Sequence, residues 1–234
     1  MDGLNLAIRF SYITNRLHYC GPKDSQDVFL RYLEKKDNAD NVRSSLKRFE
    51  GLWPYLTVIA EKHGLDPFDQ RVVEAYWIGN ELLDACTNED NCEVIRRLMK
   101  RGLPKSIGEE KIKKMSDGLV PHHVFNVVFV GVGNTTGSVP VTLQNMNNCR
   151  PSWGKVVDVQ ESQVVVASQQ IVVKEKKYVL EPDTKTAVFL PEMLTPKKGD
   201  VVALHWGFAC MVLSPGQVQN LELYTSKILK SIVP

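Results

Sequence analysis

Residues 199–209 read GDVVALHWGFA. The Gly-Asp pair is typical of a turn, and the apolar run 201–204 that follows it is typical of a β-strand. His205 and Trp206 come next, and Gly207 then precedes a second apolar run. An apolar strand does not require a polar residue at its end. The imidazole of His205 therefore makes this residue a candidate functional residue.

The region before this strand has a different pattern. From residue 25 to about 117, apolar side chains recur at intervals of three and four residues, which predicts helices. Pro54 should begin a helix or kink one, and the pair His63-Gly64 should end it. Residues 1–118 therefore predict an N-terminal helical domain.

After Gly118, apolar and polar residues alternate, which predicts strands. The segment 122–146 reads as two strands around a GNTTG turn, and further short strands follow at a spacing typical of a barrel. Ser214 and Gln217 form a capping-box pattern at the start of a last helix. Residues 119–234 therefore predict a small β-barrel with a C-terminal helix, and the whole chain an α+β fold.

The composition argues against nucleic-acid and membrane partners. The net charge is only +2, and both signs are dispersed, so no strong field attracts an anionic polymer or lipid surface. No run approaches the roughly 18–20 apolar residues of a membrane span. No signal peptide is visible, and the five cysteines are irregularly spaced. These features predict a cytoplasmic protein with free thiols and without a closed zinc site.

Two separated motifs carry a resemblance to a known family. Residues 149–156 read CRPSWGKV, and the stretch 199–209 follows with a barrel pattern between them. From Cys149 to about Leu229, the chain resembles the HypC/HupF family of nickel–iron hydrogenase maturation chaperones, which are small OB-like β-barrels with a C-terminal helix. The other barrel-motif residues are Gly154, Lys155 and Gly207.

The chain departs from the family pattern in three places. The family cysteine is almost at the start of the chain, whereas here 148 residues precede it. Trp153 stands where the family has proline, and Trp206 stands where a small residue is usual.

The resemblance implies a role in assembling a metal centre. In the family, the cysteine thiolate holds an iron that carries cyanide and carbon monoxide, and the chaperone, with its partner HypD, passes it to the hydrogenase large-subunit precursor. Carried over by position, Cys149 would bind the iron transiently, and His205 would be a second ligand or lie beside it. Thiolate suits low-spin iron. We expect Arg150, Lys155 and His205 to lower the pKa of the thiol.

The helical half resembles an uncharacterised prokaryotic domain of unknown function that is found fused to such a barrel. Its polar residues lie among large aromatic ones, and a hydrogen-bonded helical core explains them most simply. The alternative is a second metal site with oxygen and nitrogen ligands. Its candidate ligands are Glu50, Glu74, His63, His122 and His123. On a strand, the two neighbouring histidines would point to opposite faces.

Three functions remain open. The preferred one is a non-enzymatic assembly chaperone that works with a HypD-like maturation protein and the hydrogenase precursor, and it requires Cys149 to be exposed and close to His205. The second is an iron-dependent enzyme that makes or loads a diatomic ligand in a pocket of the helical domain. The third is a metal-free scaffold that binds partners, in which Cys149 is buried away from His205.

Overall fold

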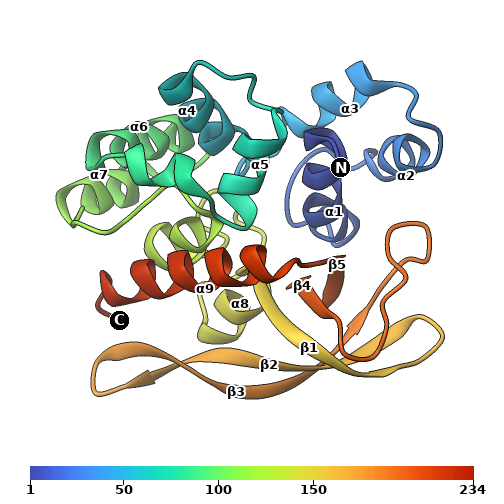
Figure 1. Cartoon of the computed structure of the whole chain (residues 1–234). Helices are drawn as coiled ribbons and strands as arrows, with labels where there is room; N and C mark the ends of the chain where they lie inside the picture. The colour runs from blue at the N-terminus through green and yellow to red at the C-terminus, as the bar shows by residue number, and fades with distance from the viewer.

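The computed structural model describes all residues from 1 to 234 and places a layer of helices above a twisted sheet (Figure 1). The first helices are α1 (Gly3–Arg16), α2 (Gln26–Lys35), α3 (Ala39–Leu46), α4 (Trp53–His63), α5 (Gln70–Trp77), the 3-10 helix η1 (Glu81–Ala85), α6 (Asn88–Met99) and α7 (Lys105–Lys113). The π-helix η2 (Phe125–Gly131) and α8 (Leu143–Cys149) follow. The chain ends with β1 (Ser152–Val159), β2 (Gln163–Lys174), β3 (Lys177–Val188), β4 (Val201–His205), β5 (Phe208–Val212) and α9 (Pro215–Lys230). This order confirms the predicted α+β class.

Local sequence signals set several helix ends. α4 ends where Gly64 adopts the left-handed conformation, at φ 64°. α9 begins with the predicted capping box, in which the Ser214 hydroxyl accepts from the backbone N–H of Gln217 at 3.3 Å. The sequence pattern does not predict α1. This helix is capped by Asp2, whose carboxylate accepts from the backbone N–H of Asn5 at 2.7 Å.

The strands form a five-stranded mixed sheet. β1 pairs with β2 and β4, β2 with β3, and β4 with β5, all antiparallel. One parallel pair, Val188 with Phe208, joins β3 to β5 and brings the edges of the sheet together. The predicted barrel is therefore closed by a single pair of residues. Gly154 allows β1 to approach β2, because a Cβ there would lie 2.4 Å from the carbonyl oxygen of Ala167.

The segment expected to form the first two strands is helical instead. It folds into η2 and α8, so the prediction of strands over 122–146 is wrong. Its apolar run is buried throughout, and Phe125 and Val130 have no exposed surface (0%). The period of a wholly buried run does not distinguish a strand from a helix. The sheet therefore begins only at Ser152, and the earlier part of the predicted domain 119–234 is helical.

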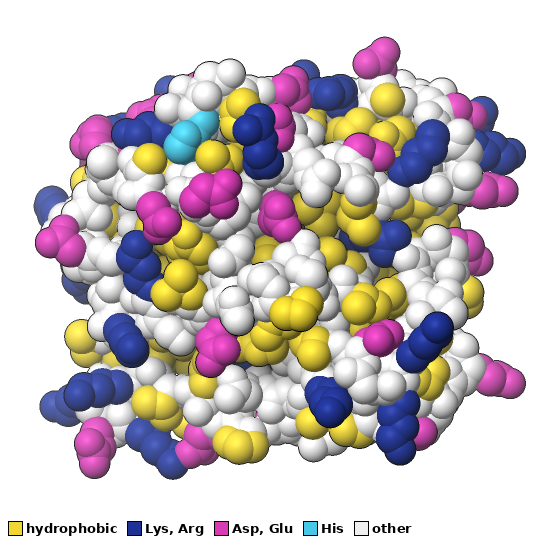
Figure 2. Space-filling model, in the orientation of Figure 1, with side chains coloured by type: hydrophobic (Ala, Val, Ile, Leu, Met, Phe, Trp, Pro, Cys, Tyr) yellow, Lys and Arg dark blue, Asp and Glu magenta, His cyan; other side chains and the backbone are white.

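One hydrophobic core runs through both parts of the chain. It contains 61 buried residues from the helices and the sheet. α9 passes between the helical layer and the long β2–β3 hairpin (Figure 1), and α1 contacts β5. Positive and negative side chains are interspersed on the face seen in Figure 2. None of the helices combines the length and apolar character needed to cross a membrane.

Candidate metal centre

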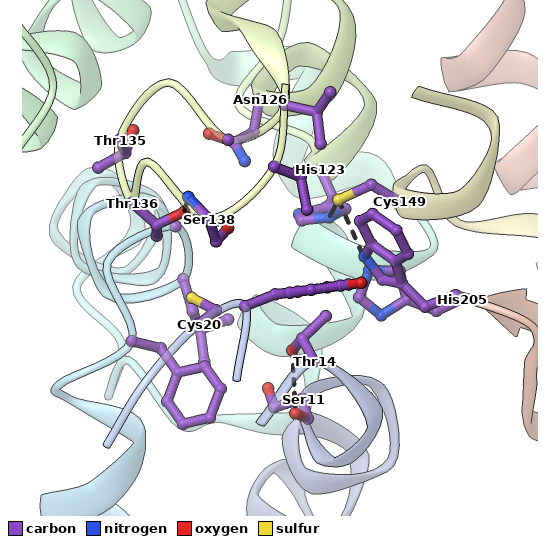
Figure 3. A pocket seen from close by; sticks show the side chains of 18 of the residues that line it. Ser11, Thr14, Cys20, His123, Asn126, Thr135, Thr136, Ser138, Cys149 and His205 are labelled. Carbon is purple, nitrogen blue, oxygen red and sulfur yellow. Dashed lines mark hydrogen bonds between the residues drawn. The ribbon is translucent and has the colours of Figure 1, made fainter. Parts of the chain in front are cut away.

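Three side chains from separate elements converge in the interior (Figure 3). Cys149 is the last residue of α8, His205 is the last residue of β4, and His123 lies two residues before η2. The Sγ atom of Cys149 is 3.6 Å from Nε2 of His123 and 3.9 Å from Nε2 of His205. All three side chains are buried, and their donor atoms lie within 4.8 Å of one another. The two residues expected from the barrel motifs thus meet His123, which was expected only as a ligand of the alternative second metal site.

The turn between β4 and β5 explains the His-Trp-Gly triplet. Trp206 and Gly207 both have positive φ, 51° and 68°. His205 pairs directly with Phe208 across the hairpin. Trp206 and Gly207 therefore form a two-residue turn of the kind that favours glycine. The backbone N–H of Trp206 donates to the carbonyl oxygen of Asn148 in α8 at 2.6 Å. This bond ties the turn to α8 and holds the imidazole opposite the thiol.

Hydrogen bonds fix both imidazoles through their Nδ1 atoms. His205 Nδ1 donates to the carbonyl oxygen of Phe10 in α1 at 2.8 Å. His123 Nδ1 lies 2.5 Å from the hydroxyl oxygen of Tyr76, and that hydroxyl donates its own proton to the carbonyl of Gly51. His123 Nδ1 is therefore the donor in its pair. Each neutral ring keeps its proton on Nδ1 and presents the lone pair of Nε2 to the thiol, as metal-binding histidines do.

Burial favours the uncharged form of all three side chains. It lowers the pKa of His205 to about 4 and lowers the pKa of His123 well below its usual range. It also raises the pKa of the Cys149 thiol to about 12, although the indole of Trp206 opposes this rise. Neutral imidazoles are ready to bind a metal, whereas the thiol must lose its proton when a cation arrives.

The expectation that basic neighbours lower the pKa of the thiol is wrong. Lys155 is exposed on β1. The guanidinium of Arg150 donates to the carbonyl oxygen of Gln169 on β2. Neither cation compensates for the burial of Cys149, so desolvation decides its pKa.

The depressed pKa of His205 predicts a loss of stability in acid. The imidazole takes up a proton near pH 6.5 in the unfolded chain but only at about 4 in the folded one. The unfolded state therefore binds more protons in this window, and the free energy of unfolding falls as the pH is lowered through it. The full shift corresponds to about 3 kcal/mol. Urea unfolding of chelator-treated protein at several pH values across the window measures this loss.

His205→Gln is the matched variant for this test, since it removes the titrating group. We expect a shallower dependence of stability on pH in the variant than in the parent. Identical pH profiles for the two proteins would contradict the assignment of the acid loss to His205.

A cavity of about 60 Å³ adjoins the three side chains. Three buried donors that line it have no hydrogen-bond partner, namely the hydroxyl of Ser11 and the indole N–H groups of Trp77 and Trp206. Buried donors are normally satisfied, so these groups are available to acceptor atoms of a small ligand. The space accommodates an ion and a few ligand atoms.

The donor set fits a transition-metal ion. Bonds of about 2.3 Å to sulfur and about 2.0–2.1 Å to nitrogen, at a tetrahedral angle, separate the two donor atoms by about 3.5 Å. The observed separations from the sulfur of Cys149 are 3.6 and 3.9 Å. Small side-chain shifts would therefore bring all three groups into ligating positions. Thiolate and imidazole suit iron, copper or zinc rather than magnesium or calcium.

A single protein family spans almost the whole chain. The model of a family of unknown function, DUF6390, matches residues 1–233. The chain belongs to this family. No curated protein and no solved structure matches it. The DUF6390 match includes the helices and the sheet, so all three residues of the metal centre lie within one family unit.

In this DUF6390 protein, the acidic residues considered for a second metal site lie apart. Glu50 accepts hydrogen bonds from the thiol of Cys20 at 3.3 Å and from the backbone N–H of Gly21 at 3.0 Å. Glu74 accepts from Nε2 of Gln217 in α9 at 2.6 Å. Neither belongs to the group around the metal centre. Both carboxylates instead join neighbouring segments of the fold.

The other two histidines of that set are also engaged elsewhere. Nδ1 of His122 accepts from the backbone N–H of Val124 at 3.1 Å. Nε2 of His63 donates to the carbonyl of Leu82 at 2.8 Å. His122 and His123 do face different ways, but they do so at the start of a helical segment rather than on a strand.

Two residues that support the metal centre carry no signal in the sequence. Phe10 contributes only its backbone carbonyl, which no side-chain pattern reveals. Tyr76 is one of several aromatic residues in α5 and its surroundings. The Asp2 cap is the only local signal that could have indicated α1, the helix that carries Phe10, and the prediction from the sequence does not include it.

Proposed function

We propose that this protein holds an iron unit through Cys149, His205 and His123 and serves nickel–iron hydrogenase assembly in the cytoplasm. The observation that supports the metal site is that the thiol of Cys149 faces the Nε2 atoms of two histidines. The Nδ1 atom of each histidine is held by a hydrogen bond, which fixes the orientation of the ring. The proposal that nickel–iron hydrogenase receives the iron is based on the resemblance of CRPSWGKV and GDVVALHWGFA to the chaperone motifs.

The cavity supports small acceptor ligands on the iron. The free donors of Ser11, Trp77 and Trp206 line the same space as the three ligating side chains. The nitrogen of a cyanide ligand accepts hydrogen bonds, and such bonds are strong in a buried site. Cyanide and carbon monoxide are small enough for the space beside Cys149.

The site differs from the exposed cysteine that the chaperone hypothesis expects, because Cys149 is buried. Only 9% of the surface of Cys149 is exposed, whereas the chaperone hypothesis requires an exposed cysteine. Residues of the glycine-rich segment 131–139 line the cavity. Transfer of the iron from or to a HypD-like partner or the hydrogenase precursor therefore requires side chains that cover Cys149 to move aside.

A three-ligand zinc site in an enzyme is the second candidate. The spacing between the sulfur and the two nitrogens is close to that of a four-coordinate ion, and three protein ligands with one open position are typical of catalytic zinc. This candidate differs from an enzyme site confined to the helical half, because β4 supplies one of its ligands.

The test is an infrared spectrum and an elemental analysis of the protein. The protein is purified without oxygen from a host that expresses hydrogenase maturation proteins. We compare the parent with Cys149→Ala and with Cys210→Ala, a control at another buried cysteine that lies outside the metal group. We expect cyanide and carbon monoxide stretching bands and stoichiometric iron in the parent and the control, and neither in Cys149→Ala.

The other outcomes separate the candidates. Stoichiometric zinc without infrared bands would favour the zinc enzyme. Bands that survive in Cys149→Ala would move the iron away from this cysteine. A parent protein that contains neither metal would overturn the metal-carrier proposal and leave the partner-binding scaffold.

A further inference from the structure

A buried cation in the sheet region lacks its full set of hydrogen-bond partners. Arg150 directly follows Cys149, and only 1% of its surface is exposed. Its Nη2 donates to the carbonyl oxygen of Gln169, whereas Nε and Nη1 have no hydrogen-bond partner. Burying a charged group with unsatisfied donors is costly unless an acceptor or an opposite charge compensates.

A second cation lies near this guanidinium. Burial and the positive charge of Arg150 lower the pKa of Lys185 on β3 to about 8, while Asp183 opposes the shift. Lys185 therefore keeps its charge at neutral pH. Asp183 is the one acidic group that acts on either cation. Two cations and one carboxylate leave this cluster with a net positive charge.

Lys185 and Asp183 line a cavity of about 550 Å³ on the sheet side of the molecule. This volume lies within the range of small-molecule sites, about 300–1,000 Å³. Amide and hydroxyl side chains make up much of the remaining wall, among them Gln144, Ser152 and Gln170. The cavity is separate from the metal cavity, and the two meet at His205 and Trp206, which line both.

We propose that this second cavity binds a small molecule through a phosphate or carboxylate group that pairs with Lys185 in the positive field of Arg150. An oxyanion supplies the negative charge that the cluster lacks, and the amide and hydroxyl groups of the wall complete its hydrogen bonds. The site uses no ligand of the metal centre for this contact and is independent of the proposed iron.

Isothermal titration of the full-length, chelator-treated protein tests this proposal. Inorganic phosphate and succinate are the two probes, and they distinguish phosphate ligands from carboxylate ligands. We expect at least one probe to bind with a Kd of about 1 mM or below. Lys185→Gln should weaken binding at least about tenfold, because it removes a charged partner of the anion.

Two further variants make the test specific. Asp183→Asn should tighten binding severalfold, because it removes the repulsive carboxylate, and a folding defect cannot produce such a gain. Lys177→Gln, at an exposed lysine on the same strand, should leave the Kd unchanged. Failure of both probes to bind the parent, or equal effects of Lys185→Gln and Lys177→Gln, would overturn the proposal. These results do not depend on whether iron is found at Cys149.

Discussion

Replacing His123 by alanine is expected to weaken metal binding roughly a hundredfold. Four-ligand zinc peptides bind with about 10–16 kcal/mol, or about 3 kcal/mol for each ligand, and each 1.4 kcal/mol corresponds to about tenfold in affinity. Nε2 of His123 lies 3.6 Å from the sulfur of Cys149 and is already in the required tautomer. Competition of cobalt(II) between the protein and a chelator measures the change, since the visible bands of cobalt also report thiolate coordination.

His122→Ala provides the matched control for this experiment. His122 is adjacent and equally buried, but its Nδ1 accepts from the backbone N–H of Val124 and its ring is not part of the metal group. We expect cobalt affinity within a few-fold of the parent for the control. A similar loss in His122→Ala and His123→Ala would indicate a general disturbance of the segment, and an unchanged affinity in His123→Ala would remove His123 from the ligand set.

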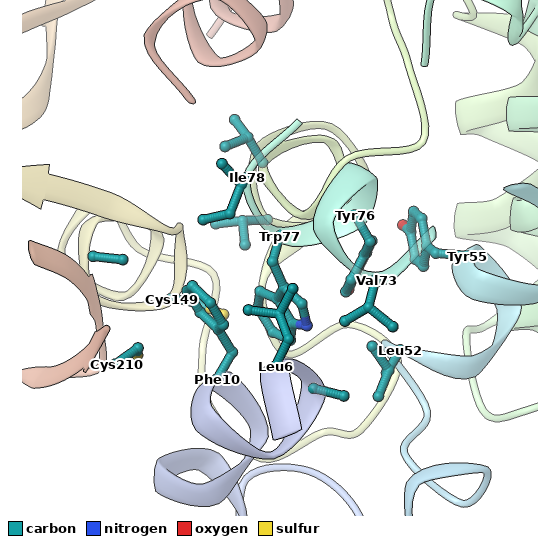
Figure 4. Packing of buried hydrophobic residues seen from close by; sticks show 14 of the residues in the cluster. Leu6, Phe10, Leu52, Tyr55, Val73, Tyr76, Trp77, Ile78, Cys149 and Cys210 are labelled. Atoms are coloured by element: carbon teal, nitrogen blue, oxygen red, sulfur yellow. The ribbon is translucent and has the colours of Figure 1, made fainter. Parts of the chain in front are cut away.

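Replacing Phe10 by alanine is expected to lower the free energy of unfolding by about 4 kcal/mol. The ring of Phe10 is completely buried (0% exposed) and stacks on Trp77 with centroids 4.8 Å apart and planes 12° from parallel. Trp77 in turn packs edge-on against Tyr76, with centroids 4.9 Å apart (Figure 4). The change removes a large apolar surface and leaves a cavity where α1 meets α5. Urea denaturation of chelator-treated protein measures the loss.

Two controls define what this result means. Phe10→Leu should cost much less, because it fills most of the cavity. Leu17→Ala, at a residue 39% exposed just after α1, should change stability by about 0.5 kcal/mol or less. The role assigned to Phe10 is contradicted if Phe10→Ala costs no more than Leu17→Ala. Because the carbonyl of Phe10 fixes His205, we also expect weaker cobalt binding in the alanine variant.

The sequence predicts best where the local signals are strong. The Gly-Asp turn with the apolar run that follows it predicts the strand β4, the capping box of Ser214 and Gln217 predicts the start of α9, and the structure contains both. Prediction fails at 122–146. Over the apolar part, 122–132, the reason is that a run buried on every side has no solvent face to reveal its period. Prediction also fails at α1, whose buried residues cover most of its length and so form no narrow apolar stripe.

The sequence by itself determined the strand that ends in His205 and the identity of Cys149 as a candidate ligand. Only the tertiary structure decided that His123 completes the group. The three residues are separated by 26 and 56 positions, and no local interaction relates them. Their convergence depends on the shared core, in which η2, α8 and β4 pack together. The distant carbonyl of Phe10 holds the imidazole of His205, and the hydroxyl of Tyr76 holds that of His123. Burial in that core also sets the protonation of the thiol, because desolvation outweighs the basic residues that neighbour it in sequence.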